Sequence, residues 1–124
     1  MAEEQTEKIM YIVTYGPDSP EKASLPFVLA NAALAMDVEV TVLLQGTAVL
    51  LARKGMVEHV VAGGLAPLKD MFKDFFEFGG KMWICGPCIK HREISEGDLI
   101  DGAEVVAGGA VITEVLAANA VLNY

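Results

Sequence analysis

Short apolar runs, rich in β-branched and aromatic residues, alternate along this chain with segments long enough to form helices. The runs predict strands over residues 8–15, 38–44, 57–61, 81–85, 104–107 and 120–124. Helices are predicted over residues 20–36, 67–78 and 109–118, with shorter ones after Gly46 and from Gly86. This order is typical of a parallel sheet, because each crossover between parallel strands needs a helix-sized connection. We therefore expect an open three-layer α/β/α domain with a mainly parallel sheet of five to six strands.

The first helix has two possible starts. Ser19, Pro20 and Glu21 have the composition of a helix N-terminus, with a capping hydroxyl, a proline and an early acid. Pro26 lies inside the predicted helix, where proline removes a backbone hydrogen bond and clashes with the preceding turn. A kink at Pro26, or a start nearer Lys22, would accommodate it.

Length and charge restrict the class of protein. The 124 residues predict one domain over residues 8–124, preceded by a flexible polar tail of residues 1–7. The net charge of −8 opposes attraction to nucleic acid or to anionic membranes, so we expect neither as a partner. Hydrophobic residues make up 53% of the chain, yet no apolar run approaches the roughly 18 residues of a membrane span. Because the first residues do not resemble an export signal, we expect a cytoplasmic protein. The apolar surplus predicts contacts between subunits.

Both cysteines of the chain follow a predicted strand directly, in the sequence Cys85-Gly86-Pro87-Cys88. Three basic residues come next: Lys90, His91 and Arg92. Nearby cations and a helix N-terminus lower the pKa of a thiol from its ordinary value of ~8.5. The sequence places Cys85 near both, so we expect its pKa to be lowered. In a reducing compartment, such a close pair is more often redox-active, sulfur-carrying or metal-binding than a structural disulfide.

Sheet topology points to the same residues. In open parallel sheets, ligands bind outside the carboxyl ends of the strands, where the connecting loops gather. Five residues fall at predicted strand ends on that edge: Gly16, Gly46, Gly63, Cys85 and Gly108. Thiol chemistry and topology therefore both place the candidate site at Cys85.

Cys-Gly-Pro-Cys is also the redox tetrad of thioredoxins. Here the tetrad lies past the middle of the chain, and no proline follows Pro87, so the order of elements does not predict a thioredoxin fold. Dithiol chemistry at Cys85 and Cys88 remains an alternative.

Two kinds of bound group are less compatible with the sequence. Cys85, Cys88 and His91 have zinc-like spacing, with His59 as a fourth candidate, but a structural zinc site usually has two such pairs. We therefore expect no metal. The pairs Gly63-Gly64 and Gly108-Gly109 match no nucleotide-binding pattern, so we expect no cofactor.

The chain resembles the DsrE/DsrF family of small sulfur-relay proteins, which includes TusD-like and YchN-like members. The resemblance rests on the order of several parts: an opening strand, a helix with the pattern Phe27-x-x-Ala30-x-x-Ala33, a strand ending at Gln45-Gly46, a cysteine that closes a later strand, the basic residues after it, and a glycine-led final helix. Gly86-Pro87-Cys88 departs from the family pattern, in which small apolar residues follow the cysteine, and His91-Arg92 replaces paired arginines.

This resemblance implies a sulfur carrier, similar to a sulfurtransferase, in which Cys85 accepts sulfane sulfur as a persulfide. The cysteine pair itself, rather than the resemblance, makes Cys88 a candidate resolving thiol. The residues expected to support the site are Gln45, Gly46, Gly86, Lys90, His91 and Arg92. Sulfur donor and acceptor proteins would be the partners, and the chain would form a homotrimer or homohexamer. A thiol-disulfide or peroxide-reducing enzyme and a non-catalytic oligomeric binding subunit remain alternative functions.

Overall fold

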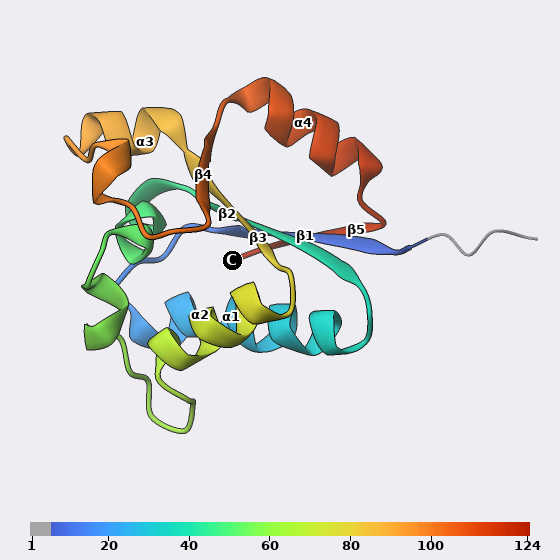
Figure 1. Cartoon of the computed structure of the whole chain (residues 1–124), viewed down its shortest axis with the longest axis horizontal. Coiled ribbons are helices and arrows are strands. Elements are labelled where there is room, and N and C mark those ends of the chain that lie inside the picture. Colours follow the sequence, from blue (N-terminus) through green and yellow to red (C-terminus); the bar gives the residue numbers. More distant parts are fainter. Residues whose placement is uncertain (1–5) are drawn as a thin grey trace, which may run out of the picture.

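A computed structural model of the protein describes residues 6–124 and contains a five-stranded sheet in the order β4-β3-β2-β1-β5 (Figure 1). All four neighbouring pairs of strands are parallel. The strands are β1 (Lys8–Val13), β2 (Glu39–Leu44), β3 (Lys81–Cys85), β4 (Ala103–Val106) and β5 (Ala120–Asn123). The α-helices are α1 (Pro20–Ala35), α2 (Leu68–Glu77), α3 (Gly86–His91) and α4 (Gly108–Ala117), and the 3-10 helices are η1 (Gly46–Ala52), η2 (Met56–His59) and η3 (Glu96–Asp98).

Helices cover both faces of the sheet. α1 and α2 lie on one face, and α4 lies on the opposite face (Figure 1). The predicted open α/β/α fold with a parallel sheet is confirmed. Of the tail predicted over residues 1–7, residues 1–5 lie outside the described part of the chain.

The main core lies between the sheet and the pair α1 and α2. Alternate strand residues such as Tyr11, Val42 and Ile84 point into it and are almost completely buried. Phe27 of α1 packs against Phe75 of α2 with ring centroids 5.6 Å apart, in an edge-to-face arrangement. Burial of each such side chain contributes about 1.5–3 kcal/mol to folding, so this layer holds the site-bearing strands rigidly.

The first helix begins at Pro20 and continues through Pro26, which is buried. A start nearer Lys22 is therefore wrong. The Ser19 side chain makes no capping hydrogen bond; its carbonyl oxygen instead accepts a bond of 2.9 Å from the backbone N–H of Ala23.

The prediction of a strand over residues 57–61 is wrong. Gly55 takes a left-handed conformation with φ 84°, and the chain then forms the 3-10 helix η2. β2 and β3 pair with each other directly, so the sheet has no place for a strand between them. As a result, His59 is exposed on a 3-10 turn, and Gly63 does not follow a strand.

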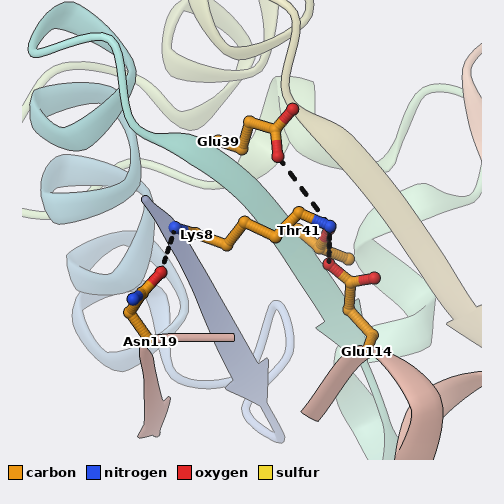
Figure 2. A network of polar contacts seen from close by, with 5 residues as sticks. All are labelled: Lys8, Glu39, Thr41, Glu114 and Asn119. Atoms are coloured by element: carbon orange, nitrogen blue, oxygen red, sulfur yellow. Dashed lines mark hydrogen bonds and ion pairs between the residues drawn. The ribbon is translucent and has the colours of Figure 1, made fainter. Parts of the chain in front are cut away.

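The helix α4 is attached to the sheet more loosely than α1 and α2. No residue of α4 is buried, and the apolar side chains of Ile112 and Leu116 are 58% and 81% exposed. Its Glu114 carboxylate lies 3.9 Å from the Lys8 ammonium and accepts a 3.4 Å hydrogen bond from Thr41 (Figure 2). Within residues 6–124, no helix has the length and apolar character needed to cross a membrane.

Candidate functional site

Cys85 is the last residue of β3, at the carboxyl edge of the sheet. Met82 and Ile84 point into the core beneath α1 and α2, so the alternation of a strand turns Trp83 and Cys85 toward the face that carries α4. Cys88 follows within the first turn of α3. The two thiols are half-buried and are not joined in a disulfide.

Cys85 lies on the wall of a cleft of about 330 Å³. The other walls come from the end of β2, the end of β4 and the first turns of α4, including Gln45, Gly108 and Val111. The described residues that line this cleft are all uncharged. The cleft lies at the carboxyl ends of β2, β3 and β4, which is the kind of position at which open parallel sheets bind ligands.

Gly46 brings the loop after β2 to the second thiol. Its backbone N–H donates a 3.2 Å hydrogen bond to the Sγ atom of Cys88. Gly46 has φ 55°, a left-handed conformation that glycine adopts without a steric penalty. Gly86 packs closely as well, because a Cβ atom there would lie 3.4 Å from the Val106 carbonyl oxygen.

The three basic residues do not gather at the thiols. Arg92 reaches back along α3 and donates a 3.2 Å hydrogen bond from Nη1 to the Cys88 carbonyl oxygen. Lys90 and His91 are exposed side chains of α3. Of the three, Arg92 is the one whose charge acts on the Cys85 thiol.

Burial raises the pKa of Cys85 above its ordinary value, and the Cys88 side chain raises it further. The Cys88 backbone N–H and, more weakly, the Arg92 charge lower it. The predicted lowering of the Cys85 pKa is therefore wrong. The physical reason is that burial penalises the thiolate more than the Arg92 charge stabilises it.

The histidines considered for zinc lie on separate elements. His59 ends η2, and His91 ends α3; both are exposed. Across residues 6–124, no three or more His, Cys, Asp or Glu side chains are grouped closely enough to hold a metal ion.

Two features of the site were missed from the sequence. One is the hydrogen bond from Gly46 to Cys88, which joins residues 42 positions apart. The other is the wall of the cleft formed by Val106, Ala107 and Val111. The position of Gly108 at a strand end was a usable signal for that wall, whereas no local pattern marks the hydrogen bond.

The model of the DsrE/DsrF-like family matches residues 7–124 of this chain. The chain belongs to the DsrE/DsrF-like family. Among relatives, the uncharacterized protein MJ0989 of Methanocaldococcus jannaschii is 30% identical over 117 residues, covering 94% of this chain and 99% of that protein. The resemblance seen in the sequence is thereby confirmed.

Solved structures share the DsrE/DsrF-like fold of this chain. The crystal structure of the ychN protein from E. coli matches with a TM-score of 0.82 and 22% identity, covering 96% of this chain and all (100%) of that one. The protein of unknown function MTH1491 from Methanobacterium thermoautotrophicum matches with a TM-score of 0.73 and 13% identity, covering 95% and 99%. At these identities the likeness establishes the fold.

Proposed function

We propose that this DsrE/DsrF-like protein is a sulfur carrier that accepts sulfane sulfur on Cys85 as a persulfide. Family membership supports a role in sulfur relay, and the position of Cys85 on the cleft wall is the observation that carries the assignment to this residue. Cys85 sulfur would bond to the outer sulfur of a donor persulfide R–S–S⁻. The donor S–S bond then breaks, the leaving R–S⁻ takes up the proton of the Cys85 thiol, and the products are Cys85–S–S⁻ and R–SH.

Cys88 sets how long a persulfide on Cys85 would last. A persulfide is lost when a second thiol attacks it. The chain has two cysteines, so Cys88 is the sole internal thiol that can do so. Attack by Cys88 on the inner sulfur releases sulfide and leaves a Cys85–Cys88 disulfide, which a cellular dithiol reductant would reopen. Sulfur donor and acceptor proteins are the proposed partners at this edge of the sheet.

Peptide mass spectrometry after brief exposure of the reduced protein to polysulfide tests this function. Wild type should retain one sulfur atom on Cys85, and the Cys88→Ser variant should retain it for longer, because the resolving thiol is absent. Cys85→Ser should retain none on the peptide that carries residues 85–88. Equal loading of Cys85→Ser and wild type would refute the assignment.

A dithiol oxidoreductase is the second candidate function. It is supported by the proximity of the two thiols, since the Cys88 side chain and backbone both act on the Cys85 thiol. This function predicts a reversible Cys85–Cys88 disulfide, a reduction potential in the range of catalytic dithiols, and turnover with a disulfide or peroxide substrate. If Cys88→Ser never holds a persulfide while wild type always forms the disulfide, the oxidoreductase function replaces the carrier.

A further inference from the structure

The cleft beside Cys85 has the size of a site for a small molecule. Its volume of about 330 Å³ lies at the lower end of the about 300–1,000 Å³ that small-molecule sites occupy. The Cys85 thiol is part of its lining, so a reactive group lies on the wall. Leu43 and Val106, near the ends of β2 and β4, bring apolar surface to the same space. A group that fills the cleft would therefore be held next to the Cys85 sulfur.

The lining of the cleft disfavours a charged ligand. Gln45 and Cys85 are its polar side chains, and the other described lining residues are apolar or glycine. Residues 40–52 and 105–113, which include β2 and β4 on the two sides of β3, contain no titratable side chain. Arg92, whose charge acts on the Cys85 thiol, is not among the described lining residues. Because moving a charge from water into apolar surroundings is costly, such walls favour an uncharged group.

Two further observations agree with an apolar occupant. Burial is the largest cause of the raised pKa of Cys85, so the surroundings of this thiol already oppose negative charge. Ile112, on the α4 side of the cleft, is 58% exposed, and an apolar ligand would remove part of this side chain from water. Gln45 supplies an amide that can orient the ligand by a hydrogen bond. Apolar walls with few polar groups are the usual composition of a small-molecule site.

We propose that Cys85, besides receiving sulfur from donor proteins, takes it directly from small organic persulfides R–S–SH whose group R is apolar and uncharged and occupies the cleft. This inference rests on the proposed carrier function. The Cys85 sulfur bonds to the outer sulfur of the persulfide, and the donor S–S bond breaks with its electron pair on R–S⁻. The leaving R–S⁻ takes up the proton of the Cys85 thiol. The products are Cys85–S–SH and R–SH, and no oxidant or reductant is consumed.

The charge preference of the cleft is tested first, without a persulfide. Three methanethiosulfonates carry butyl, sulfonatoethyl or trimethylammonioethyl groups, and each transfers its R–S group to a thiol. In Cys88→Ser, with rates divided by those of mercaptoethanol, the butyl reagent should modify Cys85 about tenfold or more faster than both charged reagents. Cys88 in Cys85→Ser is the control, because it is not among the described lining residues, and its preference should be much smaller. Equal preferences at the two thiols would overturn the proposal. Slow reaction of the anionic reagent alone would do so too, because the net charge of −8 would explain it.

Two exposed residues of α4 test whether the butyl group lies in the cleft. Ile112 lines the cleft and is 58% exposed, whereas Leu116 is 81% exposed and lies outside the described lining. In the Cys88→Ser background, Ile112→Ala should slow the butyl reagent about threefold or more, because apolar contact is lost, and should leave the charged reagents unchanged. Leu116→Ala is the matched control on the same helix and should leave all three rates unchanged. An unchanged butyl rate in Ile112→Ala, or equal slowing by both substitutions, would overturn the placement of R in the cleft.

Sulfur uptake separates this inference from the proposed function. The persulfides of butanethiol and of mercaptopropionate are similar in length and differ in charge. Mass spectrometry of Cys88→Ser should show that the butyl persulfide loads Cys85 about tenfold or more faster than the anionic one. If polysulfide loads Cys85 while the two persulfides load it equally or not at all, the substrate class is wrong and the carrier function stands. If no donor loads Cys85, the carrier function fails, and this substrate class fails with it.

Discussion

Phe75 leaves no room for a side chain at Gly80. The Phe75 ring is fully buried, and a Cβ atom on residue 80 would lie 2.5 Å from two of its ring atoms. Because the ring is wedged between Phe27 and Phe76, we expect Gly80→Ala to lower the free energy of unfolding by about 1–3 kcal/mol. Urea denaturation measures the loss. Gly63→Ala is the control, and an equal loss in both variants would contradict the explanation.

Ionisation of Tyr11 makes the free energy of unfolding depend on pH in the alkaline range. Burial, and then the nearby Tyr124, raise the pKa of the Tyr11 hydroxyl above its ordinary value of 10.0. The folded state therefore holds this proton more tightly than the unfolded chain. The stability that Tyr11 contributes is therefore complete at pH values below its pKa in the unfolded chain. It is lost as the pH rises through its pKa in the folded protein.

We expect the urea midpoint of wild type to fall more steeply between about pH 9 and 11 than that of Tyr11→Phe, which has no hydroxyl to ionise. Tyr15→Phe, at an exposed tyrosine, is the matched control and should follow wild type. Parallel curves for wild type and Tyr11→Phe would contradict the prediction.

Single residues also show where sequence reasoning about the site reached its limit. Cys85 could be predicted as a site residue because the apolar run before it shows where the strand ends. In a parallel sheet, that end of the strand lies at the edge where ligands bind. The basic residues were misjudged because closeness in sequence does not show which way a side chain points. On α3, Arg92 bonds to the Cys88 carbonyl oxygen, while Lys90 and His91 are exposed to solvent.

At the scale of elements, a small polar network ties α4 to the sheet. Glu114 contacts Lys8 and Thr41, and Asn119, just beyond the helix, accepts a 2.8 Å hydrogen bond from the Lys8 backbone N–H (Figure 2). No side chain of α4 is buried, so these polar contacts add to the packing of the half-buried Val111 and Val115 in holding the helix.

We expect Glu114→Ala to speed amide hydrogen exchange in residues 108–117 and to cost about 0.5–1 kcal/mol of overall stability. The control is Glu39→Ala. Its side chain is 55% exposed, against 16% for Glu114, and it contacts Lys8 at 3.8 Å without touching α4. Equal exchange rates in the two variants would show that the network does not hold the helix.

The elements differ in how well their sequences defined them. β3 was predicted over its full extent, because a dense apolar run is bounded there by glycines on both sides. Residues 57–61 have a similar composition, but residues 57–59 belong to η2 and residues 60–61 to the loop that follows it. The difference is tertiary: β3 has a partner on each side, whereas the direct pairing of β2 with β3 leaves no partner for residues 57–61. Local composition does not contain that information.

At the scale of the whole molecule, the exposed apolar surface of α4 is the main unpartnered feature. The helix has one charged residue, Glu114, and exposes Ile112 and Leu116. The resemblance to the family predicts a homotrimer or homohexamer, and we propose that copies of the chain pack through α4. Burial of such a surface is the usual driving force of stable homo-oligomers.

Light scattering coupled to size-exclusion chromatography tests this packing. Wild type should have the mass of three or six 13.2 kDa chains, and Leu116→Glu should dissociate toward the monomer because it buries an unpaired charge. Met36→Glu, at a methionine that is 76% exposed beyond the end of α1, should keep the wild-type mass. A monomeric wild type, or an unchanged mass for Leu116→Glu, would refute the proposal.

The position of β1 has a consequence for synthesis on the ribosome. β1 is the first strand of the sheet to be made, yet it lies inside the sheet, with β2 on one side and β5, the last strand, on the other. Until residues 120–123 have emerged, β1 has a row of unpaired backbone groups along one edge, which is a template for pairing with another nascent chain. Completion of the sheet therefore waits until residues 120–123 have been made, and chains that terminate before residue 120 are expected to aggregate rather than to fold.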